Sequence, residues 1–142
     1  MKRRESLLRL KRCRVDDLKR RMATLDGMHA DVERKLSDLE EAIARERQRA
    51  NDTDIGRLAF PSFLRAMDLR RENLRTTLKD IARERTQAQQ DLGDAFQDLK
   101  SLELATEQEA KRVAETQLRK SQMRLDEIAL SRHLRKQALR QI

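Results

Sequence analysis

The side chains of this sequence that could do chemistry are few and widely spaced. Its 142 residues include two histidines, one cysteine and no tryptophan or tyrosine. His29 is followed by Glu33, a spacing that puts both side chains on one helix face and could hold a metal ion. His133 cannot join them, because the two histidines would lie at least about 70 Å apart on a straight helical hairpin. We therefore interpret His29 as a polar residue within a helical seam.

The sequence also lacks the motifs of catalysis and cofactor binding. Cys13 is the only cysteine, so the chain can form no internal disulfide and no cysteine-based zinc site. Neither of the glycine-rich phosphate-binding motifs, GxxxxGK[ST] and GxGxxG, occurs, and no Ser/His/Asp set is recognisable. We expect an inert exposed thiol at Cys13 and predict a protein that is not an enzyme, with no catalytic, cofactor-binding or metal-binding residues.

The composition indicates long helices rather than a globular core. Charged residues make up 41% of the chain, hydrophobic residues 37% and aromatic residues only 2%. Such a chain can line a seam between helices but cannot fill a thick interior. The basic N-terminus is not followed by the apolar segment of a signal peptide, and no apolar run is long enough to cross a membrane. We expect a cytoplasmic protein.

Apolar residues recur at alternating steps of three and four, the pattern of a coiled coil. The first series runs from Leu8 to Ala50, interrupted only by Lys11, His29 and Glu46. A second, less pure series runs from Leu64 to Leu102. These patterns predict a first helix over residues 3–50 and a second over 61–138.

The turn formers of the chain are concentrated between these two series. Residues 51–54 read Asn-Asp-Thr-Asp, Gly56 follows, and Pro61 is the only proline. Because proline is favoured in the first turn of a helix, the pattern predicts a turn over 51–60 and a helix restarting at Pro61. Two helices so connected should fold back on each other, with residue i facing roughly residue 112 − i.

The predicted fold is therefore all-α. We expect residues 1–142 to form a single domain, a long antiparallel two-helix coiled-coil hairpin. Under the fold-back rule the N-terminus meets residues near 109, so about thirty C-terminal residues have no partner within the chain. They form a projecting C-terminal helix, with apolar residues on more than one face.

Both ends of the chain are basic and its middle is mildly acidic. Residues 1–21 carry a net charge of +7, residues 111–142 carry +6, and residues 22–110 carry −5. Three interpretations of the basic ends are open: a solvated face, a surface that binds nucleic acid, and a surface that binds an acidic protein. The uncovered C-terminal helix also leaves open a structural coiled-coil homo-oligomer.

The nucleic-acid interpretation has a specific weakness. A basic stretch ahead of a heptad series superficially resembles a bZIP basic region, which enters the DNA major groove as an uncovered helix. Here Leu8, Val15 and Leu18 continue the seam through the basic stretch, and the stretch has no asparagine to contact a base. We expect no specific nucleic-acid binding.

Two stretches carry a resemblance to a known family. The opening MKRRESLLRLKRCRVDDLKRR and the later LAFPSFLRAMDLRRENLRTTL resemble the flagellar type III export proteins called FliJ, in particular their alphaproteobacterial type. The resemblance implies a non-enzymatic stalk that inserts its paired terminal end into the hexameric flagellar export ATPase and promotes its assembly and activity. It also implies contact with the cytoplasmic domain of the membrane export gate, possible escort of export chaperones, and a peripheral location at the inner membrane beneath the flagellum.

Candidate contact residues follow from combining this resemblance with the charge map. We predict that a basic tip at the open end of the hairpin contacts the ATPase ring through Arg9, Arg12, Lys19, Lys120 and Arg124. Many family members carry tyrosines on the gate-facing surface, but this chain has none. We predict instead that the gate is contacted at the hairpin turn by Phe60, Phe63 and Met67.

Overall fold

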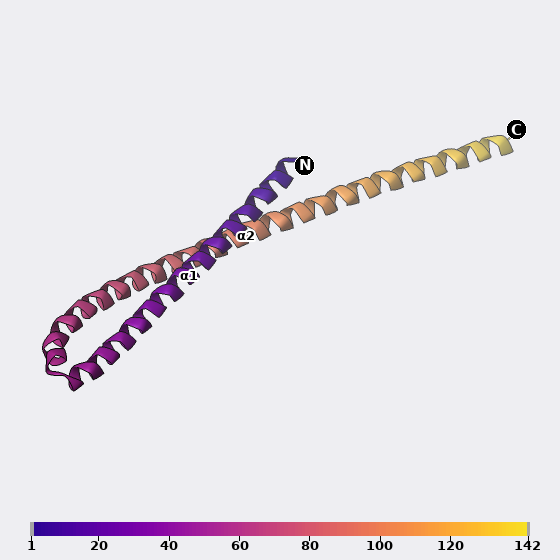
Figure 1. Ribbon diagram of the computed structural model, residues 1–142. Helices are drawn as coiled ribbons and strands as arrows, with labels where there is room; N and C mark the ends of the chain where they lie inside the picture. Colours follow the sequence, from indigo (N-terminus) through magenta and orange to yellow (C-terminus); the bar gives the residue numbers. More distant parts are fainter. Residues whose placement is uncertain (1, 142) are drawn as a thin grey trace. The chain divides into compact units, whose positions relative to one another are not determined.

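Two long α-helices make up the part of the chain that the structure describes. The structure is a computed structural model that describes residues 2–141. Helix α1 spans Lys2–Asp52 and helix α2 spans Asp54–Arg140 (Figure 1). The all-α prediction is thus confirmed for these residues, and α1 ends within two residues of its predicted end.

The chain forms two compact units, each of which combines parts of both helices. One unit holds residues 9–97, which contain most of α1, the turn and the first half of α2. The other holds the residues up to Leu8 together with those from Asp98 onward.

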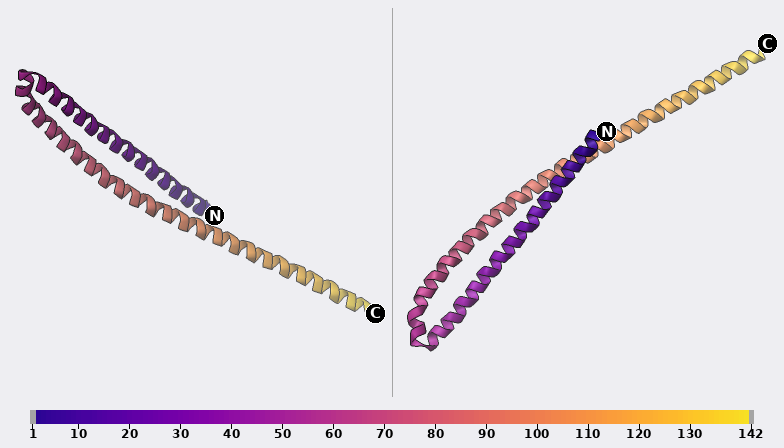
Figure 2. Two further views of the ribbon diagram at one scale, coloured as in Figure 1. Left: turned by 90° about the horizontal axis from the view of Figure 1, so that it is seen from below. Right: turned by 45° about the horizontal axis from the view of Figure 1, so that its top comes forward.

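In the unit of residues 9–97, α1 and α2 lie side by side along a narrow apolar seam (Figure 2). All of the buried residues fall at positions of the two predicted series: Val15, Leu18, Leu25, Val32, Leu39, Ile43, Ala50, Ile81, Ala88 and Ala95. Removing this apolar surface from water stabilises the pair by roughly 25 cal/mol per Å². The α2 side contributes two alanines, whose small side chains let the helix backbones approach closely.

Ion pairs between the helices report their direction and register. Asp26 Oδ1 lies 2.9 Å from Arg85 Nε, and Glu40 Oε1 lies 3.9 Å from Arg71 Nε. As the α1 number rises from 26 to 40 the α2 number falls from 85 to 71, so the helices are antiparallel. Each pair of numbers adds to 111, which agrees with the predicted fold-back about 112.

The connection between the helices is much shorter than predicted. Only Thr53 separates them, whereas the sequence pattern predicted a turn over residues 51–60. The Thr53 side chain caps α2, since its Oγ1 accepts a hydrogen bond from the Gly56 N–H at 3.1 Å. Arg57 donates from Nη2 to the backbone oxygen of Asn51 at 3.2 Å and so satisfies a carbonyl at the end of α1. Of the polar residues in the predicted turn, Thr53 caps α2, and Asn51 and Asp52 belong to α1.

The predicted start of the second helix at Pro61 is therefore wrong. Pro61 lies inside α2, in its second to third turn. A proline there cannot donate to the carbonyl four residues earlier and usually bends the helix. The ribbon of α2 does curve over these first turns (Figure 1). The Thr53 cap lets helix form before the proline, which a rule based on proline alone did not anticipate.

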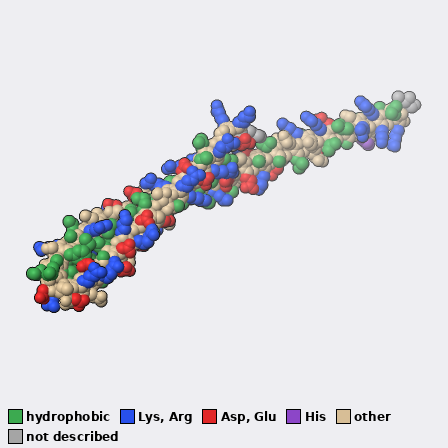
Figure 3. Space-filling model, in the orientation of Figure 1, with side chains coloured by type: hydrophobic (Ala, Val, Ile, Leu, Met, Phe, Trp, Pro, Cys, Tyr) green, Lys and Arg blue, Asp and Glu red, His purple; other side chains and the backbone are tan. Residues whose placement is uncertain are grey.

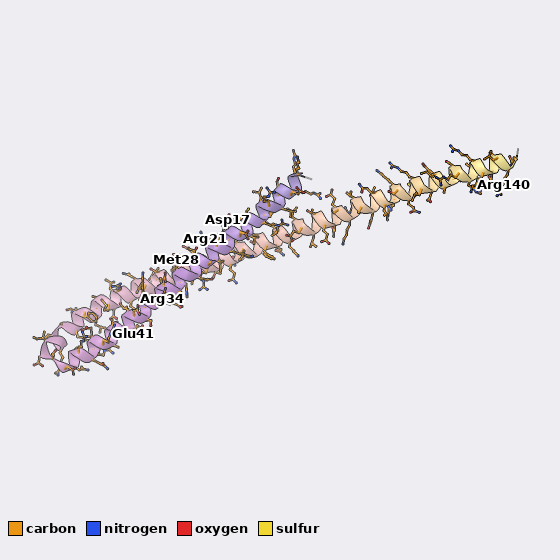
Figure 4. The ribbon with its side chains drawn as sticks, turned by 45° about the vertical axis from the view of Figure 1, so that its right-hand side comes forward. Asp17, Arg21, Met28, Arg34, Glu41 and Arg140 are labelled. Carbon is orange, nitrogen blue, oxygen red and sulfur yellow. The ribbon has the colours of Figure 1, made fainter. Side chains whose placement is uncertain are left out.

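In the second unit, the start of α1 lies against α2 and the rest of α2 is uncovered. Arg4 forms an ion pair with Glu109, near the residue expected to meet the N-terminus. Leu8, Leu99, Leu102 and Thr106 are partly buried, but every residue over 107–141 is exposed. Figure 4 shows the side chains of this last part of α2 standing out without a second helix beside them. The predicted projecting C-terminal helix is confirmed.

Candidate partner-binding surfaces

The two phenylalanines predicted to contact the gate lie against the end of α1. Phe60 and Phe63 stack at an angle, with ring centroids 6.3 Å apart and ring planes inclined by 35°. The guanidinium carbon of Arg47 lies 5.7 Å from the centre of the Phe60 ring, within range of a cation–π interaction. Phe60, Phe63 and Met67 are all partly buried. The rings thus stabilise the turn region as well as leaving part of their surface open.

Phe63 also borders a small surface hollow. The hollow has a volume of about 220 Å³ and is lined by Ala42, Arg45, Glu46, Arg49 and Phe63. Its walls combine one aromatic ring with two arginines and a glutamate, and Arg49 Nη1 lies 3.3 Å from Glu46 Oε1. Such walls suit an apolar or acidic side chain of a protein partner.

Two further apolar residues at the turn are more exposed than the aromatic rings. Ile55 and Leu58 are each 82% exposed, and they lie three residues apart at the start of α2. Figure 3 shows hydrophobic side chains at the surface around the turn. The sequence pattern does not single out these two residues, because it predicts a turn over residues 51–60. Their three-residue spacing after an N-capping threonine would have indicated a shared helix face.

The five residues of the predicted basic tip are all exposed, and they divide between the two units. Arg9, Arg12 and Lys19 belong to the unit of residues 9–97, whereas Lys120 and Arg124 belong to the other. The first three residues and the last two are thus two groups in different units. Their joining into one basic tip remains a prediction.

Acidic residues offset some of the basic charge near the first group. Arg21 Nη2 lies 3.9 Å from Glu84 on α2, and Arg20 Nη1 lies 3.6 Å from Asp17 on its own helix (Asp17 and Arg21 are labelled in Figure 4). Both pairs are largely exposed, so each contributes at most about 1 kcal/mol to stability. The arginines are therefore available to exchange these partners for those of a binding protein.

The histidine and the cysteine singled out in the sequence have simple surroundings. His29 lies in the seam with its Nδ1 3.4 Å from Glu33 Oε1, as the interpretation of a polar seam residue requires. Cys13 is exposed. Over residues 2–141 no group of three or more potential ligands is placed to hold a metal ion. Within the same range, neither helix contains a stretch apolar enough, over sufficient length, to cross a membrane.

Comparison with known proteins identifies the family. A family model described as "Flagellar FliJ protein" matches residues 1–138. No curated protein and no solved structure matches the chain. Since the family match spans nearly the whole chain and both long helices, this protein belongs to the FliJ family, a component of flagellar type III protein export.

Proposed function

We propose that this protein is a non-enzymatic stalk that joins the flagellar export ATPase to the membrane export gate. The observation that carries the proposal is the exposure of all five predicted ring-contact residues on a two-helix hairpin of a FliJ-family chain. A paired helix with a basic end can enter an oligomeric ring without a catalytic group of its own. Its role is to favour ring assembly and thereby ATP hydrolysis.

The charge of the two ends of the chain supports the proposed contact with the ATPase ring. Residues 1–21 and 111–142 carry net charges of +7 and +6, and the basic side chains stand out from the surface of α2 in Figure 3. If the inner loops of the ring are acidic, this charge raises the rate of encounter more than the final affinity. Activation of the ATPase should accordingly weaken as ionic strength rises.

The exposed apolar side chains at the turn support the proposed contact with the export gate. Ile55 and Leu58 add two open side chains to the partly buried Phe60, Phe63 and Met67. Exposed apolar clusters of this kind, with arginine nearby, are typical binding anchors. We assign this turn surface to the cytoplasmic domain of the gate, which places the protein at the cytoplasmic side of the inner membrane. Escort of export chaperones is a compatible role.

The test compares ATPase stimulation with DNA binding by the same preparation. The purified chain is added to the export ATPase and, separately, to random duplex DNA, both at about 150 mM salt, where exposed charges are well screened. We expect stimulated ATP hydrolysis and no DNA binding. DNA binding without stimulation would replace the stalk by a protein that binds nucleic acid through its basic helical ends.

A further inference from the structure

The last part of α2 carries several large apolar side chains that are exposed to solvent. Six large apolar side chains between residues 118 and 134 are more than half exposed: Leu118 (75%), Met123 (66%), Leu125 (62%), Ile128 (51%), Leu130 (59%) and Leu134 (55%). Apolar side chains scattered singly over a surface are normal, but aligned ones mark a binding face. The arrangement of these six along the helix is therefore informative.

Helical spacing sorts them into two stripes on opposite sides of α2. The first stripe advances by steps of three or four residues and consists of Ala110, Ala114, Leu118, Ser121, Leu125 and Ile128. The second stripe consists of Met123, Leu130 and Leu134. At 100° per residue the two stripes lie about half a turn apart, so one docking helix cannot cover both.

The first stripe leads out of a hollow beside the start of α1. The hollow has a volume of about 390 Å³, and its walls include Arg4, Glu5, Ala110, Val113 and Ala114. Two of these wall residues are the first two members of the stripe. Because alanine side chains are small, the backbone of a docked helix can approach α2 closely there. The hollow and the stripe together form a continuous surface on which a second helix can lie along α2.

The charges beside the stripes differ. The residues that continue or flank the first stripe include two acidic ones, Glu107 and Glu115, and five basic ones: Lys111, Arg124, Arg132, Arg135 and Lys136. One of the acidic residues is already paired, since Glu107 Oε1 lies 3.7 Å from Lys111 Nζ. The second stripe is flanked by Arg112, Arg119 and Lys120 but also by Asp126 and Glu127. Only the first stripe thus presents an apolar line between predominantly basic borders.

We propose that the first stripe is a docking surface for an acidic amphipathic α-helix of another protein. Leucines of that helix pack on Leu118, Leu125 and Ile128, and its carboxylates face the lysines and arginines beside the stripe. A second copy of this chain fits poorly, because its equivalent stripe would bring like charges together. The inference does not rest on the ATPase contact, since docking is measured without the ATPase.

The probe is a synthetic peptide of about four heptads, with leucine at the two seam positions and glutamate at the flanking positions. Its binding to the full chain is followed by fluorescence anisotropy at about 150 mM salt. Replacing Leu118, Leu125 and Ile128 by serine should weaken binding at least about tenfold, a loss that corresponds to 1.4 kcal/mol or more. The matched control replaces Met123, Leu130 and Leu134 by serine and should change the affinity by less than about twofold.

A second peptide with lysine in place of glutamate tests the charge argument and should not bind. The proposal is overturned if the glutamate peptide does not bind, if both triple variants lose binding equally, or if the lysine peptide binds as tightly.

Sedimentation velocity of the unmodified chain supplies the remaining test. Self-association that disappears in the Leu118, Leu125 and Ile128 variant would show that a second copy covers the stripe. Because all six residues are exposed, circular dichroism should show nearly unchanged helical content in both variants.

Discussion

Single glycines have different roles at different places in this hairpin. A Cβ added at Gly56 would lie 2.6 Å from Thr53 Oγ1 and 3.0 Å from Ala50 Cα. The absence of a side chain thus lets the first turn of α2 approach the last turn of α1. Gly27 and Gly93 have no such neighbour within 4 Å of an added Cβ.

Replacing Gly56 by alanine should therefore destabilise the hairpin by about 1–3 kcal/mol, the range typical of steric crowding. Gly27→Ala and Gly93→Ala are the controls and should stabilise by about 0.5–1 kcal/mol, because alanine favours the helical state. Thermal unfolding followed by circular dichroism measures all three. A melting temperature for Gly56→Ala as high as that of the controls would show that the close approach at the turn is not needed.

The apolar residues at the turn divide into packed rings and open aliphatic side chains. Replacing both Phe60 and Phe63 by alanine should abolish gate binding and motility, but it should also lower stability by about 1–3 kcal/mol since the rings are partly buried. Replacing both Ile55 and Leu58 by serine should weaken gate binding without lowering the melting temperature. Binding of the purified gate domain and unfolding are measured in parallel.

Leu10→Ser is the control for this gate prediction, since Leu10 is 66% exposed on α1 far from the turn along the chain. It should change neither gate binding nor stability. If the alanine variant lost stability but kept gate binding, the phenylalanines would act only as a cap over the turn.

At the scale of the elements, the pairing of α1 with α2 follows from their seams. Leu25 and Ala88 are 3% and 2% exposed, and their numbers add to 113, close to the sum of 111 for the Asp26–Arg85 and Glu40–Arg71 ion pairs. Leu25→Cys with Ala88→Cys, in a Cys13→Ser background, should therefore form an intramolecular disulfide on oxidation. Non-reducing electrophoresis distinguishes it from a linked dimer.

A displaced pair tests the register. Leu25→Cys with Leu74→Cys moves one thiol by fourteen residues, or about 21 Å along α2, and should give no intramolecular bond. Exclusively intermolecular products from the Leu25 and Ala88 pair would replace the hairpin by a swapped or parallel dimer.

At the scale of the whole molecule, the distribution of charge is the property that function should depend on. The net charge of +8 comes from the two basic ends, partly offset by the acidic middle. Changing Arg9, Arg12, Lys19, Lys120 and Arg124 to glutamate should weaken ATPase activation and reduce its dependence on salt. Helical content should stay nearly unchanged, because all five side chains are exposed.

A control with the same change in net charge separates position from total charge. It reverses five exposed basic residues between the ends: Lys35, Arg75, Lys79, Arg83 and Lys100. This variant should activate the ATPase almost normally. Equal loss in both variants would mean that only net charge matters, and unaltered activation in the first would remove the electrostatic part of the proposed function.

The presence of two helices, their antiparallel register, the buried seam and the uncovered C-terminal helix could all be predicted from the sequence. The prediction was possible because each feature depends on local periodicity: residues such as Val15, Leu25 and Ala88 recur at the helical period, and a long second helix must extend beyond a shorter first one. The family resemblance, carried by the stretches at residues 1–21 and 58–78, was likewise present in the sequence and agrees with the match over residues 1–138.

The geometry of the turn and the exposure of the residues around it could not be predicted from the sequence. At the turn the Thr53 cap is combined with a close approach of Gly56 to Ala50, where an added Cβ would lie 3.0 Å from Cα, and the turn-forming residue types alone do not specify this geometry. Pro61 was therefore mistaken for a helix start. For the same reason Phe60 came to lie partly buried near Arg47, while Ile55 and Leu58 became the open apolar surface. Which side of a helix is covered depends on the partner that lies against it, and no spacing within one segment contains that information.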